Sequence, residues 1–198
     1  DGPRRASRLP AGTKVALRNL DNAPIERVLF GATWDNRDFD VDMCAVLLDS
    51  SGRVPDKDHF LYRRNRQLPD RRGFVGFVSP GESSGPDRAQ ILLDLEHLSP
   101  AIEDVVVAFS AVQRRALLSE TGMIKARAMD LDNGQTSYVY LHDGGRLGTA
   151  TCLSLWALQR RGSGWDVVVH GTPYAGGPPA FARDHGVRVA IELHPGFL

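Results

Sequence analysis

Three aspartates at alternate positions are the strongest candidate for binding chemistry in this sequence. Asp38, Asp40 and Asp42 alternate with apolar residues and lead into the apolar run of residues 43–48. Successive side chains of a strand point to opposite faces, so we expect the three carboxylates on one face. A hard divalent cation such as Ca²⁺, which takes about 6 to 8 oxygen ligands in flexible geometry, would relieve their mutual repulsion. A solvated edge strand that uses charge against aggregation explains the same pattern, and the spacing leaves both interpretations open.

Other patterns of metal binding or catalysis are missing from the sequence. Met43 stands where an EF-hand loop carries its sixth-position glycine, and Asp49 where it carries the bidentate glutamate. The six histidines form no H-x-x-x-H pair, and neither a G-x-S-x-G motif nor a phosphate-binding loop occurs. We therefore expect a protein without enzymatic activity, although a triad assembled from distant residues would leave no local pattern.

A cluster of arginines forms a second candidate site. Five arginines lie within ten residues beside Tyr62, namely Arg63, Arg64, Arg66, Arg71 and Arg72. Arginine clusters bind phosphate groups or RNA through bidentate hydrogen bonds and stacking. They also occur as solvated surface that is balanced by acids elsewhere. The cluster is thus a candidate contact for an anion or a partner, with a solvated surface as the alternative.

The elements that must position these residues are mostly strands. Short β-branched and apolar runs recur between turn signals at residues 13–18, 26–33, 39–48, 74–78, 89–95, 104–112, 123–131, 136–142, 150–160, 165–170 and 187–193. About ten strands at this spacing indicate an all-β fold, a two-sheet β-sandwich. Tight primed turns are expected at residues 132–134 and 161–164. One or two short helices are expected near the C-terminus, with residues 178–185 as the clearest case.

Composition indicates the class of protein and its domain organisation. The chain has 198 residues, is 42% hydrophobic and 24% charged, and carries no formal net charge, as in an ordinary globular protein. We expect residues 1–12 to be a flexible lead-in or linker and residues 13–198 to form one domain. Cys44 and Cys152 lie in apolar runs and are expected to be reduced thiols in a cytoplasmic protein. Neither a nucleic-acid partner nor a membrane span is indicated.

The order of several motifs resembles a known family, the tellurium-resistance (TerD) domain proteins. The matching segments are V-L-F-G-A-T-W-D at residues 28–35, D-F-D-V-D-M-C-A-V-L-L at residues 38–48, and W-D-V-V-V followed by G-T-P-Y-A-G-G at residues 165–177. Together they span residues 13–193 in the family's order, which is more specific than any single motif. The resemblance implies a two-sheet sandwich, calcium held by acidic loops at one end, and a role in bacterial stress and tellurite resistance without catalysis.

The sequence also departs from the family's pattern. Only Asn36 and Arg37 separate the tryptophan-aspartate pair from the D-F-D run, where family members usually carry more residues including a glycine. The loop of residues 79–88, strongly acidic in the family, keeps only Glu82 and Asp87. Fewer carboxylates weaken calcium binding.

Two functions follow as expectations. In the first, the chain is a TerD-like stress-response domain that binds calcium through Asp38, Asp40 and Asp42, with Asp35 and Glu82 as lesser ligands. In the second, it is a metal-free scaffold that acts through protein contacts or the arginine-rich loop. In both, its partners are expected to be other proteins of a stress-response assembly.

Overall fold

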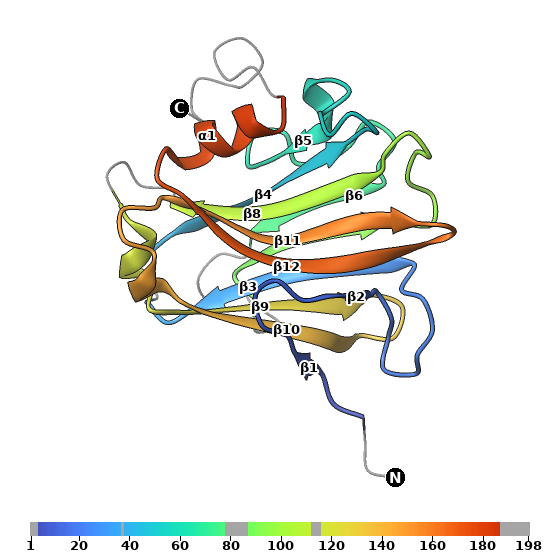
Figure 1. The fold of residues 1–198 in the computed structure, drawn as a ribbon, viewed down its shortest axis with the longest axis horizontal. Helices are drawn as coiled ribbons and strands as arrows, with labels where there is room; N and C mark the ends of the chain where they lie inside the picture. The colour runs from blue at the N-terminus through green and yellow to red at the C-terminus, as the bar shows by residue number, and fades with distance from the viewer. Residues whose placement is uncertain (1–3, 37, 78–86, 112–115, 187–198) are drawn as a thin grey trace.

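The computed structural model describes residues 4–36, 38–77, 87–111 and 116–186, and these form two packed β-sheets (Figure 1). Sheet A contains strands β1, β10, β9, β3, β7 and β6 in that spatial order, with bounds Ser7–Arg8, Gln135–Asp143, Met123–Asp130, Arg27–Trp34, Ala89–Asp94 and Gly73–Phe77. Sheet B contains β2, β12, β11, β8, β4 and β5, with bounds Lys14–Ala16, Gly164–Tyr174, Cys152–Arg161, Asp104–Ala111, Val41–Leu48 and Phe60–Leu61. The predicted two-sheet sandwich is confirmed.

The main core lies between the two sheets. Large apolar side chains from sheet A, such as Phe30 and Ile91, meet Met43, Phe109 and Trp156 from sheet B, and all five are fully buried. Burial of apolar surface is the main favourable term in folding, so this layer holds the two sheets together.

Strand β4 is covered on both faces, which explains why residues 43–48 are apolar without alternation. Its inward side chains join the main core, while Cys44 and Val46 belong to a second cluster on the outer face of sheet B. Phe181 and Ala182 of helix α1 (Gly177–Asp184) complete that cluster. We therefore expect polar residues in β4 only at the beginning of the strand, where this cover ends.

The described part of the N-terminal segment joins the sandwich, although we expected residues 1–12 to be a flexible lead-in. β1 pairs in parallel with β10, and the Leu9 amide donates to the Val139 carbonyl oxygen at 2.9 Å. The Leu9 side chain is buried in the main core. A two-residue pairing and one apolar side chain are too short to produce a periodic pattern, so no periodicity marks this strand in the sequence.

Most other elements lie where the sequence placed them, with small differences. β1 and β5 are additional two-residue strands, and the run at residues 187–193 lies outside the described residues. The β9–β10 hairpin turns through residues 131–134, where Gly134 has a φ of 70° and Asn133 stays out of the left-handed region, so this is not the two-residue primed turn we expected. No described helix is long and apolar enough to cross a membrane.

Both cysteines are buried free thiols in the described fold. Burial raises the pKa of Cys44 and Cys152 well above the ordinary value, so both remain protonated near neutral pH. This agrees with the expectation of reduced side chains that pack as small apolar groups.

Candidate functional site at the start of strand β4

The acidic segment, residues 38–42, lies in the connection that crosses from sheet A to sheet B and at the first residues of β4. The connection is closed by local hydrogen bonds: the Trp34 indole Nε1 donates to the Phe39 carbonyl oxygen at 2.7 Å, and the Phe39 amide donates to the Asn36 carbonyl oxygen at 3.2 Å. Asn36 Oδ1 also accepts from the Asp38 amide at 3.1 Å. Because Trp34 and Phe39 are both buried, they anchor the connection and leave its aspartates at the surface.

The expected alternation of side chains is present, but the strand begins later than we predicted. Phe39 and Val41 are buried, Asp38 and Asp40 are exposed, and Asp42 is half-buried. β4 begins at Val41, so Asp38 and Asp40 belong to the connection and only Asp42 is a strand residue.

An arginine occupies the position beside the acidic segment. Arg63 Nε donates to Asp42 Oδ1 at 2.5 Å, and its Nη2 contacts the same oxygen. Arg63 Nη2 also lies 3.9 Å from Asp40 Oδ2. Burial raises the pKa of Asp42 above its ordinary value, and the hydrogen bond and charge of Arg63 oppose that rise. The two sites that the sequence analysis treated separately therefore meet here, through Arg63.

A second arginine binds the backbone of the connection. The Arg88 guanidinium lies 4.1 Å from the centroid of the Trp34 ring, and its Nη1 donates to the Asn36 carbonyl oxygen at 3.2 Å. Its Nη2 donates to the Phe39 carbonyl oxygen at 3.4 Å. Loop carbonyls are common calcium ligands, and these two already accept hydrogen bonds from a cationic side chain.

Asp35 is held by a different part of the fold. Its Oδ2 accepts from the Met123 amide at 2.9 Å, and its own amide donates to the Met123 carbonyl oxygen at 3.2 Å. Gly122 precedes Met123 with a φ of 76°, and a Cβ there would lie 2.9 Å from the Asp35 Cβ. Glycine is thus required for the close approach that fixes Asp35 to the start of β9.

These contacts do not fit a calcium site built from the described residues. Within the described ranges, no group of three or more His, Cys, Asp or Glu side chains is placed to hold a metal ion. Asp42 is bound by Arg63 and Asp35 by a backbone amide. Glu82, the remaining predicted ligand, lies outside the described residues.

The five clustered arginines do not form one surface. Arg63 binds the start of β4 in sheet B, whereas Arg72 Nη1 donates to Asp94 Oδ2 at 3.0 Å at the end of β7 in sheet A. Arg66 Nε donates to the Arg63 carbonyl oxygen at 2.9 Å, and Arg71 has a φ of 64° in the turn before β6. Arg64 is exposed.

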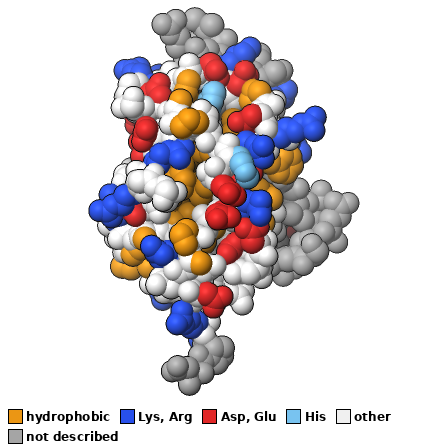
Figure 2. Space-filling model, turned by 90° about the vertical axis from the view of Figure 1, so that its right-hand side faces the viewer, with side chains coloured by type: hydrophobic (Ala, Val, Ile, Leu, Met, Phe, Trp, Pro, Cys, Tyr) orange, Lys and Arg blue, Asp and Glu red, His pale blue; other side chains and the backbone are white. Residues whose placement is uncertain are grey.

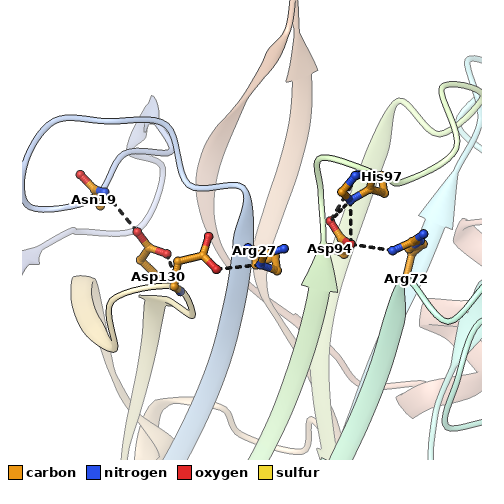
Figure 3. A network of polar contacts seen from close by, with 7 residues as sticks. Asn19, Arg27, Arg72, Asp94, His97 and Asp130 are labelled. Atoms are coloured by element: carbon orange, nitrogen blue, oxygen red, sulfur yellow. Dashed lines mark hydrogen bonds and ion pairs between the residues drawn. The ribbon is translucent and has the colours of Figure 1, made fainter.

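Asp94 belongs to a polar network at one end of sheet A. Figure 3 shows Arg72 and His97 converging on its carboxylate, with Arg27 and Asn19 holding acids near the neighbouring strand ends. Burial alone would raise the pKa of Asp94, but hydrogen bonds from His97 and Arg72 outweigh it and lower that pKa. Arg63 and Arg72 are therefore each paired with an acidic side chain of the protein itself.

The structure reveals a buried ion pair that sequence reasoning missed. Arg127 binds Asp87 through Nε to Oδ1 at 2.9 Å and Nη2 to Oδ2 at 2.5 Å, and the Asp87 side chain is only 2% exposed. Gln90 Nε2 donates to the same carboxylate at 3.1 Å. A Cβ at Gly31 would overlap the carboxyl group of Asp87. A glycine inside an apolar strand run was the available signal for this close approach.

Comparisons with known proteins agree with this architecture. The chain is 25% identical over 191 residues to the tellurium resistance protein TerD of Serratia marcescens, covering 92% of this chain and 98% of that protein. It is 24% identical over 195 residues to general stress protein 16U of Bacillus subtilis (strain 168), covering 91% and 97% respectively.

Solved structures share the fold. A protein of unknown function superposes with a TM-score of 0.63 at 23% identity, covering 83% of this chain and 99% of its own. A homologue of the telluride resistance protein TerD from Streptomyces coelicolor superposes with a TM-score of 0.62 at 17% identity, with the same coverage. The model of the TerD domain family matches residues 6–185. The chain belongs to the TerD domain family.

Proposed function

We propose that this chain is a non-catalytic TerD domain of a bacterial stress-resistance system, that it binds other proteins of that system, and that arginine stabilises its acidic segment in place of calcium. The names of its relatives, a tellurium resistance protein and a general stress protein, support the stress-resistance role. The observation that carries the proposal is the contact of Arg63 with Asp42 and Asp40.

Charge balance explains why arginine is sufficient at this position. A guanidinium presents several N–H donors in a fixed plane, and hydrogen bonds between ionised groups are stronger than neutral ones. Arg63 gives Asp42 two of these contacts, and Arg88 donates to the nearby carbonyl oxygens. Asp42 and the carbonyl oxygens of Asn36 and Phe39 are therefore already bound by cationic side chains of the protein.

The described residues hold one serine–histidine hydrogen bond, and it does not form part of a catalytic triad. Ser154 Oγ lies 2.9 Å from His170 Nδ1, but Ser154 is only 1% exposed. Within the described part of the chain, no carboxylate is hydrogen-bonded to His170, so the group that orients the base of a catalytic triad has no counterpart here. A nucleophile in this position would have no access to substrate.

Calcium binding is the second candidate function, and one observation favours it. Asp38 and Asp40 are exposed, and the contact of Arg63 with Asp40 is long, at 3.9 Å. In this alternative, the ion would be held at the acidic segment, with Asp38 and Asp40 as its accessible carboxylates. Calcium would then compete with Arg63 for the acidic segment.

Thermal unfolding with and without calcium separates the two candidates. A ligand that binds only the native state raises the melting temperature by mass action. We expect no rise at millimolar calcium for the wild-type protein, and the same result for Asp40→Asn. A rise in the wild type that disappears in Asp40→Asn would favour calcium binding over the arginine-stabilised domain.

A further inference from the structure

Three aromatic side chains form a line from the main core to the surface at strand β10. The ring of Trp156 on β11 packs edge-on against the ring of Tyr140 on β10, with centroids 6.1 Å apart. The Tyr140 ring lies next to the imidazole of His142, with centroids 5.9 Å apart. Trp156 is fully buried and Tyr140 is 3% exposed, whereas His142 is half-buried and lines a surface depression with Arg8 and Pro10. The line therefore joins the centre of the sandwich to its surface.

The hydroxyl group of Tyr140 is held against His142. Tyr140 Oη lies 2.7 Å from His142 Nδ1, which is hydrogen-bond distance. A Cβ at Gly171 of β12 would overlap this hydroxyl, so the glycine lets the phenol oxygen pack directly on the backbone of β12. The hydroxyl is thus confined between the two sheets, and His142 is its one hydrogen-bond partner among the described residues.

The ionisation states of this pair suit the transfer of a proton from the phenol to the imidazole. Burial raises the pKa of Tyr140 and lowers the pKa of His142. Near neutral pH the phenol therefore keeps its proton, and the imidazole is neutral with one ring nitrogen able to accept. A tyrosine that loses an electron becomes a strong acid and releases its phenol proton. His142 Nδ1 is the base at hydrogen-bond distance for that proton.

Trp156 has no such base. Its indole Nε1 is buried and has no hydrogen-bond partner within the described part of the chain. An oxidised Trp156 would therefore keep its N–H proton and remain a radical cation, which is a stronger oxidant than a neutral radical. The Tyr140 ring is the electron donor in contact with it. A buried donor without a partner is costly and requires an explanation, and a tryptophan that passes on its charge without losing a proton supplies one.

We propose that Trp156, Tyr140 and His142 form a relay that carries one-electron oxidation from the core to the surface. A one-electron oxidant, such as a free radical in solution, takes an electron from Trp156 by tunnelling. The Trp156 radical cation takes an electron from Tyr140 while the phenol proton moves to His142 Nδ1. This step leaves neutral Trp156, a neutral tyrosyl radical and an imidazolium ion, so charge and atoms balance. A small reductant such as ascorbate then returns the electron, and His142 returns the proton to the phenol.

Flash photolysis tests this relay, with tris(bipyridine)ruthenium and an electron-accepting quencher as the source of the one-electron oxidant. Transient absorption distinguishes a tryptophan radical cation from a tyrosyl radical. In the wild type, we expect the tryptophan signal to appear first and to decay as the tyrosyl signal forms. Tyr140→Phe should abolish that tyrosyl signal and lengthen the lifetime of the tryptophan signal, while Trp156→Phe should slow tyrosyl formation.

The variant His142→Asn separates a base from a mere hydrogen-bond acceptor, because an amide oxygen accepts from a hydroxyl but does not take up its proton. It should slow tyrosyl formation by about 100-fold, the lower end of the effect of a positioned base. Tyr138→Phe is the matched control and should leave the rate unchanged, since Tyr138 Oη donates to the Ala16 backbone carbonyl oxygen and not to a base.

Each of these substitutions keeps a side chain of similar size, and the melting temperature of each variant checks that it is folded. The proposal is overturned if the wild type forms no tyrosyl radical, or if that radical forms at an undiminished rate in His142→Asn. A tyrosyl signal that persists at full yield in Tyr140→Phe, or one that is lost in Tyr138→Phe, would also overturn it. The relay is independent of the acidic segment and of any calcium bound there.

Discussion

At the scale of single residues, the contacts of the Asp42 carboxylate show how the acidic segment is stabilised. Its carboxylate is half-buried where β4 begins, and burial of an unpaired charge is expensive. Arg63 supplies the opposite charge at hydrogen-bond distance, and Arg88 binds the carbonyl oxygens of the preceding connection. Asp42 and Asp40 therefore belong to an arginine–carboxylate cluster at the start of β4.

Replacing Arg63 by alanine should destabilise the fold by about 1 kcal/mol at pH 7, because it leaves Asp42 without its partner. The loss also removes an interaction that lowers the pKa of Asp42, so this pKa rises further. As the pH falls through that raised pKa, the folded state takes up a proton and the cost of the unpaired charge disappears. Urea unfolding at pH 7 and pH 4.5 should show a larger destabilisation at pH 7 than at pH 4.5.

Asp42→Asn provides the background for this test, since it removes the charge that Arg63 balances. In that variant, Arg63→Ala should cost much less than in the wild type. A destabilisation of equal size at both pH values, or one unchanged in the Asp42→Asn background, would show that Arg63 acts through packing and not through the carboxylate.

Two half-buried histidines, His170 on β12 and His185 at the end of helix α1, should make stability depend on pH. Burial lowers the pKa of both His170 and His185, and His185 packs against Phe181 with ring centroids 4.9 Å apart. Below a pH of about 6.5 the unfolded chain gains protons that the folded state resists, so the free energy of unfolding falls. The melting temperature should therefore drop between pH 7.5 and pH 5.5, and drop less in the double variant His170→Gln, His185→Gln. Equal slopes for the two proteins would contradict this assignment.

At the scale of elements, the buried pair of Asp87 and Arg127 joins three neighbouring strands of sheet A. Arg127 lies on β9, Gln90 on β7 and Gly31 on β3 between them, and the Asp87 carboxylate lies over Gly31. Because Gly31 has no side chain, the carboxylate reaches both neighbours. Asp87, two residues before β7, is thereby fixed to the middle of the sheet.

Removing one partner of this pair should be strongly destabilising. Asp87→Ala leaves the Arg127 charge buried and unpaired, which typically costs about 3 to 5 kcal/mol. Replacing both residues with apolar ones, as in Asp87→Leu with Arg127→Met, should recover much of that loss. Chemical denaturation of the two variants measures the difference. A double variant no more stable than Asp87→Ala would contradict an electrostatic role for the pair.

The long strands were predictable because their side chains follow simple rules of burial. The alternation in residues 89–95 and the continuous apolar run in residues 43–48 both correspond to observed strands. The short strands β1 and β5 were missed, since two residues carry no period. The acidic segment was found from its spacing, but its pairing with Arg63 joins residues 21 positions apart, and sequence alone does not show which arginine reaches which acid.

At the scale of the whole molecule, acidic and basic residues are equal in number. Figure 2 shows acidic and basic side chains interspersed with hydrophobic ones over one end of the sandwich. The chain as a whole carries no formal net charge. Charge is balanced locally at Asp42 and Asp94, where an arginine contacts each carboxylate.

Calcium titration of the wild-type protein by isothermal calorimetry tests most directly whether arginine has replaced the ion at the acidic segment. The account predicts no saturable heat of binding up to millimolar calcium, for the wild type and for Asp38→Asn alike. A one-to-one binding curve in the wild type that is lost in Asp38→Asn would contradict it.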